Sequence, residues 1–151
     1  MQLIFCFYLA FASAAWGTDR PPSPELTPEN VVEIVAEAMA NNDSPRPDSG
    51  IERAFQFASP SNRAVTGPFW RFKTMIQQPD YAPLINHTSR VIGEPDFFGD
   101  AVSIPLIIFA ANGEAAGFLW SLSKQTGGAY IDSWMTDSVV RVPIGSKLKA
   151  L

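Results

Sequence analysis

The spacing of apolar residues changes near Pro79, and this change restricts the fold more than any other feature. Before Pro79, apolar residues recur every three or four positions, as in amphipathic helices. After it, they alternate or form runs rich in β-branched residues, as in strands. A chain of 151 residues with 46% apolar residues is long enough to bury one core. We therefore predict a single α+β domain in which N-terminal helices pack on a β-sheet.

Three helices are expected in the first half of the chain. They cover residues 28–41, 51–58 and 67–78. Thr27 and Thr66 are suited to cap the first and third helices, each shortly before a proline. The second helix should stop before Pro60, because proline disfavours helical geometry in the preceding residue. Between the second and third helices, residues 61–63 are expected to form one isolated turn.

Four antiparallel strands are expected in the second half. A short strand at residues 91–92 precedes three long ones at residues 101–111, 115–123 and 129–142. Asn112-Gly113 is a favoured dipeptide for a tight hairpin between the first two long strands. Pro105 lies in the middle of its strand and cannot donate to a ladder, which predicts an edge position or a bulge. The pattern therefore predicts a curved antiparallel meander.

Both faces of the predicted sheet are largely apolar. Phe118, Trp120 and Leu122 alternate with Gly117, Leu119 and Ser121, whose face is not properly polar either. One face should pack on the helices, so the other is expected to meet a second copy of the chain. We therefore predict a homodimer formed through the sheet.

The first residues differ in composition from the rest. An apolar run of about ten residues is too short to span a bilayer but suits the centre of a signal peptide. We predict a cleaved signal at residues 1–15, a proline-rich linker at 16–25, one domain at 26–143 and a C-terminal tail at 144–151. The expected destination is the secretory route, either secretion or an endomembrane lumen. The alternative is the plastid of an alga with a complex plastid, because residues 12–16 resemble the junction between signal and transit peptides there.

The remaining composition narrows the classes of function. The net charge is −4 with no basic cluster, which argues against nucleic-acid binding. Cys6 is the only cysteine and His87 the only histidine, so we expect no disulfide, no metal site and no cofactor. Asn86-His87-Thr88 is an N-glycosylation sequon, and Asn86 is therefore a candidate glycosylation site. We expect His87 to lie on a surface loop.

Several short motifs together resemble a known family. They are residues 57–60 (FASP) with Asn62-Arg63, residues 66–68 (TGP), residues 81–84 (YAPL) and residues 134–137 (WMTD). They resemble an uncharacterised family, the domain of unknown function 4864, of the nuclear transport factor 2-like (cystatin-like cone) superfamily. The resemblance covers about residues 26–142 and implies three N-terminal helices on a curved sheet of about four strands. The family has no established activity, so no catalytic residue is carried over from it.

The superfamily resemblance implies a place for a site, which is the mouth of the cone between the helices and the concave sheet. The candidate pocket residues are Phe57, Phe72, Tyr81, Trp120, Tyr130, Asp132 and Trp134. Asp132 shares its predicted strand face with two aromatic residues, where a carboxylate is suited to proton transfer. The alternative position for Asp132 is in solvent. Asp137 would either accept backbone hydrogen bonds at a strand end or face the pocket.

Two main functions remain open at this point, beside the weaker possibility of a purely structural subunit of a larger complex. The first is a small-ligand-binding or interaction domain without a catalytic motif, in which the ligand is a small apolar molecule. The alternative is an isomerase- or dehydratase-type enzyme with Asp132 or Asp137 as base and Tyr81 or Tyr130 as hydrogen-bond donor. Polar residues between the helices either form a lip over the pocket or cap helix ends. These residues are Ser59, Asn62, Arg63 and Thr66.

Overall fold

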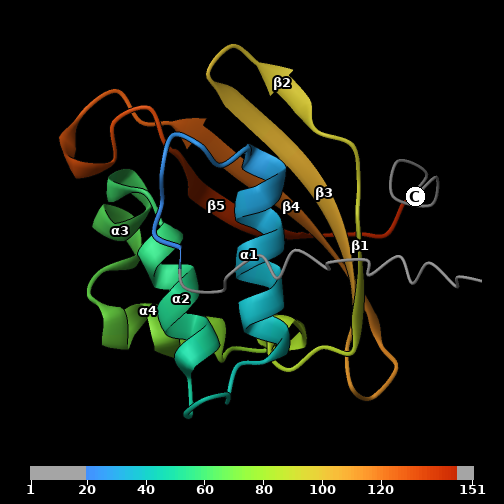
Figure 1. The fold of residues 1–151 in the computed structure, drawn as a ribbon. Helices are drawn as coiled ribbons and strands as arrows, with labels where there is room; N and C mark the ends of the chain where they lie inside the picture. Colours follow the sequence, from blue (N-terminus) through green and yellow to red (C-terminus); the bar gives the residue numbers. More distant parts are fainter. Residues whose placement is uncertain (1–19, 146–151) are drawn as a thin grey trace, which may run out of the picture.

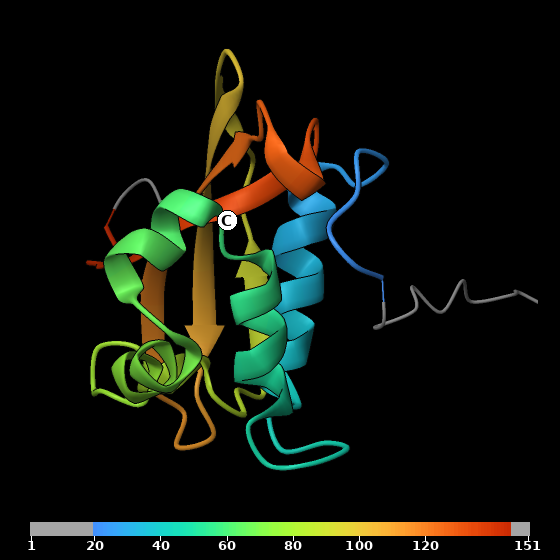
Figure 2. The ribbon, with the colours of Figure 1, turned by 90° about the vertical axis from the view of Figure 1, so that its left-hand side faces the viewer.

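The computed structural model describes residues 20–145, and these form four α-helices followed by an antiparallel sheet of five strands. The helices are α1 (Pro28–Ala40), α2 (Ser49–Phe57), α3 (Pro60–Thr66) and α4 (Phe69–Ile76). The strands are β1 (Ser89–Ile92), β2 (Asp96–Phe98), β3 (Ala101–Phe109), β4 (Ala115–Lys124) and β5 (Trp134–Val142). Figures 1 and 2 show the helices gathered on one face of the open sheet. The predicted α+β class is therefore confirmed.

Helix α1 begins as the sequence predicts. The Thr27 hydroxyl accepts from Asn30 N at 3.2 Å, and the Asn30 side chain accepts from Thr27 N at the same distance. This reciprocal cap satisfies two N–H groups that a helix start otherwise leaves without partners. The face toward the sheet is then fully apolar. Its buried side chains are Val31, Val32, Val35, Ala36 and Met39.

Helices α1 and α2 lie close together because Gly50 has no side chain between them. A Cβ atom at Gly50 would overlap the Ala38 carbonyl oxygen and lie 2.8 Å from Cα of Asn42. The connecting loop is held by the Asn42 side chain, whose Oδ1 accepts from Ile51 N at 3.0 Å. The Asn42 amide also donates to Asp43 Oδ1 at 2.9 Å. These contacts fix where α2 begins.

The segment between α2 and α4 is more helical than expected. Residues 61–63 belong to the seven-residue helix α3 and not to an isolated turn. Ser59 caps α3 by accepting from Asn62 N at 3.2 Å. Gly67, at φ +82°, then turns the chain into α4. The predicted Thr66 cap of the third helix is wrong, because α4 has Pro68 at its N-cap and the Thr66 hydroxyl donates back to Asn62 O.

The strand order of the sheet is β1-β3-β4-β5, and β2 pairs with β3 beside β1. The sequence did not predict β2, whose three residues are all exposed and carry no alternation. Pro105 lies in β3, which is an inner strand, yet it faces the gap between β1 and β2. The Pro105 carbonyl accepts from Gly93 N at 2.8 Å on that side. No strand residue pairs with Pro105 between β1 and β2, so its missing N–H breaks no ladder hydrogen bond. Pro105 was predicted at a sheet edge or a bulge, and it lies instead in an inner strand, opposite a gap between two neighbouring strands. The predicted hairpin at Asn112-Gly113 is confirmed.

The last strand begins later than expected. Residues 129–133 lie outside β5, and residues 128–130 form a 3₁₀ turn. Strand β5 contains one irregularity, since Ser121 pairs with Ser138 while its neighbour Leu122 pairs with Thr136. Asp137 is therefore the extra residue of a β-bulge. The bulge changes which β5 residues share a face with those of β4.

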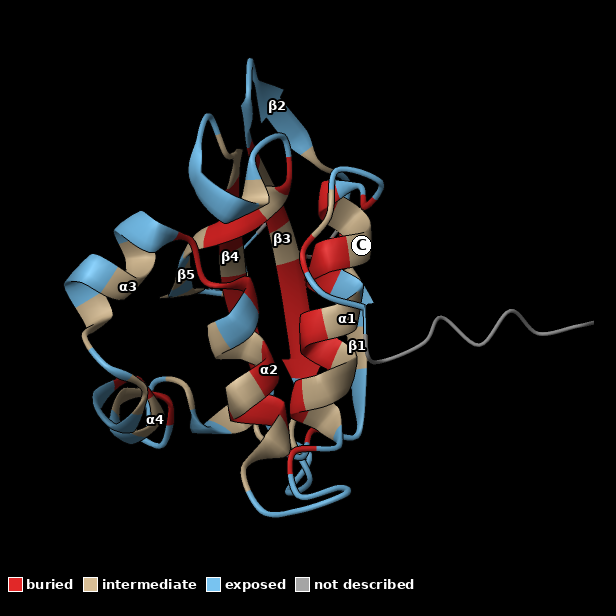
Figure 3. Ribbon diagram, turned by 60° about the vertical axis from the view of Figure 1, so that its left-hand side comes forward, coloured by how far each residue is buried: buried red, intermediate tan, exposed pale blue. Residues whose placement is uncertain are grey.

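The two faces of the sheet differ in what covers them. The inner face supplies Ile104, Leu106, Phe118, Trp120 and Leu122 to the core beneath the helices. On the outer face, the pairing aligns Val91 with Ile107, Gly117 and Val142, and Pro105 with Leu119 and Val140. No helix among the described residues packs on this outer band. Figure 3 shows the buried residues on the sides of α1 and α2 that meet the strands.

The segment before β1 is anchored to the helices. His87 is only 4% exposed, which contradicts the expected surface loop, and its Nδ1 lies 2.8 Å from Leu84 O. Asn86 is exposed, but its amide bonds Asp43 Oδ2 at 2.7 Å and Asn42 N at 3.1 Å. Glycosylation of Asn86 stays a prediction. The predicted signal peptide lies outside the described residues, among which no helix is long and apolar enough to cross a membrane.

Candidate functional site

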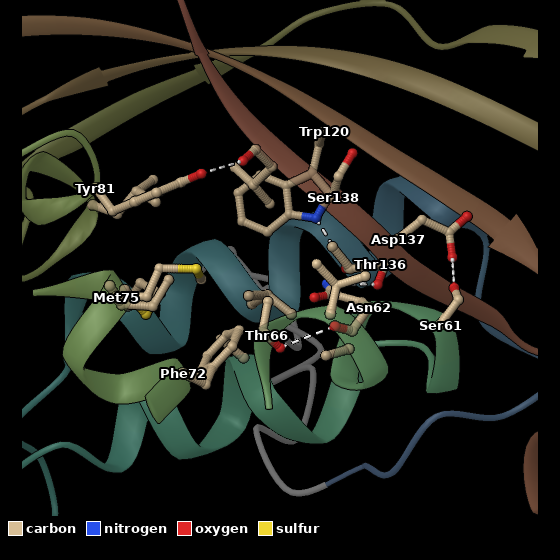
Figure 4. A pocket seen from close by; sticks show the side chains of 18 residues that line it. Ser61, Asn62, Thr66, Phe72, Met75, Tyr81, Trp120, Thr136, Asp137 and Ser138 are labelled. Atoms are coloured by element: carbon tan, nitrogen blue, oxygen red, sulfur yellow. Dashed lines mark hydrogen bonds between the residues drawn. The ribbon is translucent and has the colours of Figure 1, made fainter. Parts of the chain in front are cut away.

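A cavity of about 440 Å³ lies between the helices and β5. Its walls come from α1, α2, α3, α4, the 3₁₀ turn Ala82–Leu84 with the preceding Tyr81, and strands β4 and β5. Figure 4 shows the side chains that surround it. The volume lies in the range of pockets that hold small molecules. The inner layer of the fold is therefore not completely filled by its aromatic side chains.

The cavity exists because α3 and α4 bury few side chains, whereas α1 turns a continuous apolar face toward the sheet. Helix α3 contributes no buried residue, and α4 buries only Phe72 and Ile76. Figure 3 shows α3 and α4 mostly exposed or half-buried and set to one side of α1 and α2, with α3 in contact with β5. Val65, at the end of α3, lines the cavity and is 80% exposed, so it marks the opening.

Most of the cavity wall is apolar. The apolar lining residues are Val35, Met39, Ala54, Ala58, Val65, Phe72, Met75, Ile76, Leu84, Trp120 and Val139. Met75 is half-buried, and a flexible thioether can adapt to ligands of different shape. The wall thus favours a molecule that is mainly apolar.

Polar groups gather at one end, where α3 meets β5. Asn62 Nδ2 donates to Thr136 O at 3.0 Å, and Ser59 N donates to the same oxygen at 2.8 Å. The Ser61 hydroxyl donates to Asp137 Oδ1 at 3.4 Å. These bonds join α3 to the bulge of β5, and the bulge places the half-buried Asp137 at the rim of the cavity.

Two aromatic residues connect the polar end with the opposite one. Trp120 Nε1 donates to Thr136 Oγ1 at 3.0 Å within the buried part of the wall. The Tyr81 hydroxyl donates to Val139 O at 3.1 Å. Figure 4 shows Tyr81 and Asp137 on opposite sides of Trp120. Tyr81 therefore stabilises β5 from the helical side and leaves its phenolic oxygen available only as an acceptor.

The structure brings only some of the predicted pocket residues together. Phe72, Tyr81 and Trp120 line the cavity, as does Asp137. Phe57, Tyr130, Asp132 and Trp134 are not among the lining residues. Phe57 is fully buried in the core, and Trp134 packs against the core with its ring 6.1 Å from that of Phe97.

The predicted strand position of Asp132 is wrong. Asp132 lies in the loop before β5, exposed and at φ +62°, and its backbone N donates to Gln125 O at 2.8 Å. Tyr130 belongs to the adjacent 3₁₀ turn. The sequence alternation that placed Tyr130, Asp132 and Trp134 on one strand face is not structural, because β5 begins only at Trp134. Tyr130 and Asp132 lie in the turn and loop before it.

The polar residues between the helices divide between the two expected roles. Ser59 caps α3, and the Arg63 guanidinium donates to Phe55 O at 2.8 Å and Gln56 O at 2.9 Å at the end of α2. Arg63 also lies 4.7 Å from the centre of the Phe55 ring. Asn62 and Thr66 line the cavity and form part of its lip.

Sequence reasoning missed other residues of the wall. Ser61, Met75, Thr136 and Val139 all line the cavity. Met75 follows Phe72 by three positions on α4, and that helical spacing could have predicted it. Thr136 and Val139 share the inner face only because of the bulge at Asp137, for which the sequence carries no clear signal.

The described cavity wall carries a single charge, and comparison with known proteins gives no match. Among residues 20–145, Asp137 is the only charged residue in the cavity wall. The same residues contain no group of three His, Cys, Asp or Glu side chains that could hold a metal ion. No family model, curated protein or solved structure matches the chain. The site must therefore be interpreted from its own chemistry.

Proposed function

We propose that this protein binds a small, mainly apolar molecule in the cavity between its helices and β5. The observation that carries the proposal is a hollow of about 440 Å³ with an apolar wall and polar groups at one end. Burial of the ligand's apolar surface would supply most of the affinity, and the polar end would orient the ligand. The exposed Val65 marks where such a molecule enters.

The test is binding of a neutral apolar probe to the full chain. N-phenyl-1-naphthylamine becomes fluorescent in apolar surroundings, and we expect saturable binding to the wild-type protein. Ala54→Phe fills part of the cavity from α2 and should weaken probe binding at least about tenfold. Ala129→Phe makes the same change at an exposed position outside the wall and should not. Equal binding by all three proteins would contradict the proposal.

The geometry gives less support to an enzyme. An isomerase or dehydratase needs a base and a hydrogen-bond donor directed at one substrate. Asp137 borders the cavity, but the Tyr81 hydroxyl already donates to Val139 O. The other proposed pair, Asp132 and Tyr130, lies outside the wall. We therefore propose binding in preference to catalysis.

We also propose that the fold is of the nuclear transport factor 2-like kind, with a second copy bound at the outer sheet face. The order of helices before a curved antiparallel sheet supports the proposed fold.

The proposed second copy is supported by the outer band, an apolar surface without charged side chains. Its residues are Val91, Pro105, Ile107, Leu119, Val140 and Val142. The row beside the band consists of Ser103, Ser121 and Ser138, and the exposed Asp96 of β2 lies at its end.

A further inference from the structure

The polar end of the cavity offers mainly hydrogen-bond acceptors, because most of the donors in the wall are already engaged. The Thr66 hydroxyl donates to Asn62 O at 3.0 Å, and Trp120 Nε1 donates to Thr136 Oγ1 at 3.0 Å. The Tyr81 and Ser61 hydroxyls likewise donate within the wall. Each hydroxyl that donates keeps lone pairs that can accept.

Two acceptors in particular lack partners among the described residues. Asn62 donates through Nδ2 to Thr136 O, and this bond fixes the orientation of the amide, so that Oδ1 is left without a partner. Asp137 Oδ2 is likewise without a partner, since the bond from Ser61 goes to Oδ1. The remaining donors, such as the Thr136 hydroxyl proton, are neutral groups.

The charge in the wall has one sign. Asp137 is its only charged residue, and no Lys or Arg of the described chain lines the cavity. Asp137 is half-buried, so its charge is screened less than that of a carboxylate in open solvent. A ligand carboxylate in this cavity would meet a like charge without a compensating cation.

We propose that the ligand is an apolar molecule with a hydrogen-bond-donating head, and that a protonated amine is the preferred head. The amine lies at the polar end and donates to Asp137 Oδ2 and Asn62 Oδ1, while the apolar part fills the space next to Met75 and Phe72. Charge-assisted hydrogen bonds are stronger than neutral ones, so the amine is bound more tightly than an alcohol of the same length. This inference rests on the proposed function and specifies its ligand class.

The test compares three probes that differ only in the head group: octylamine, 1-octanol and octanoate. Each is titrated against N-phenyl-1-naphthylamine bound to the full chain at about pH 7.5, where the amine is protonated and the carboxylic acid ionised. We expect octylamine to displace the fluorescent probe at concentrations about tenfold lower than octanoate, with 1-octanol between them. Asp137→Asn, which keeps the shape and the bond from Ser61, should reduce the preference for octylamine several-fold.

Asp132→Asn is the matched control. It changes the net charge of the chain by the same amount as Asp137→Asn, but at an exposed residue outside the cavity. Asn also tolerates the positive φ of this position. It should leave the preference unchanged. Octanoate displacing the probe as well as octylamine, or no displacement by any of the three, would overturn the inferred ligand class. If the fluorescent probe itself binds and Ala54→Phe abolishes that binding, the cavity remains the binding site in either case.

Discussion

Asn42 joins three parts of the chain through its side chain and backbone. It is 2% exposed, and its Oδ1 accepts from Ile51 N in the first turn of α2. Its backbone N donates to Asn86 Oδ1 at 3.1 Å, which connects the end of α1 to the segment before β1. Since a buried group without a partner costs more than a bond adds, Asn42 controls stability more than its size suggests.

Replacing Asn42 tests this role. Asn42→Ala leaves Ile51 N without its partner and should lower the free energy of unfolding by about 2 kcal/mol in urea. Asn41→Ala is the control, because Asn41 is exposed and its amide bonds only Glu37. That change should cost less than about 1 kcal/mol. Similar losses in both variants would contradict the role assigned to Asn42.

His87 makes stability depend on pH. Burial lowers the pKa of its imidazole below 6.5, against the raising effect of the bond with Leu84 O. Arg90 lowers this pKa further, whereas Glu37 and Glu33 raise it. Because the folded state then binds the proton more weakly than the unfolded state, the full stability is present above pH 6.5. It falls as the pH drops through 6.5 toward the lower pKa of the folded state.

The measurement is urea unfolding of the wild type and of His87→Gln at about pH 7.5 and about pH 5.5. His87 is the only histidine of the chain, so no other imidazole titrates in this interval. The wild type should lose stability at the lower pH, and the variant should lose much less, whatever its stability at the higher pH. An equal loss in both proteins would show that His87 is not the group responsible.

At the scale of elements, the contact between α1 and α2 depends on Gly50. Gly50→Ala would force the helices apart and should cost about 2 kcal/mol or more of unfolding free energy. Gly127→Ala adds the same methyl group where nothing lies within 4 Å and should be close to neutral. Thermal unfolding of both variants checks the difference. A stable Gly50→Ala protein with unchanged α1–α2 packing would contradict the account.

How well the elements could be predicted depended on whether their signals were local. The cap at Thr27 and the alternation in β4 lie in the neighbouring residues, and both predictions are confirmed. The position of Pro105 could not be foreseen, because it depends on the gap between β1 and β2, and β2 has no apolar pattern. The start of β5 was placed too early because apolar residues continue through the preceding loop.

At the scale of the molecule, we propose that one face of the sheet serves ligand binding and the other serves dimer formation. The inner side carries the cavity, and the outer band is proposed to bind a second copy. Val140→Lys places a charge in the band, at a residue that is 47% exposed, and should convert a dimer into a monomer in light scattering coupled to size exclusion. Ile131→Lys, in a loop at a residue 52% exposed, should leave the dimer intact. A monomeric wild type would contradict this proposal.

The site was harder to predict than the fold because it joins residues distant in sequence. Phe72, Tyr81 and Trp120 could be selected as aromatic residues near the expected mouth, and all three line the cavity. The bulge that places Asp137 and Thr136 depends on pairing with β4, which a single sequence does not specify. Asp132 was selected for an alternation that the loop before β5 does not continue.

The central claim is that the cavity holds the ligand, and its methionines allow the most direct test. Met39 and Met75 line the cavity, whereas Met135 is buried outside it. With ¹³C-labelled methionine methyl groups, we expect octylamine to shift the signals of Met39 and Met75 in a saturable way and to leave that of Met135 in place. No saturable shift, or a shift of Met135 alone, would contradict the account.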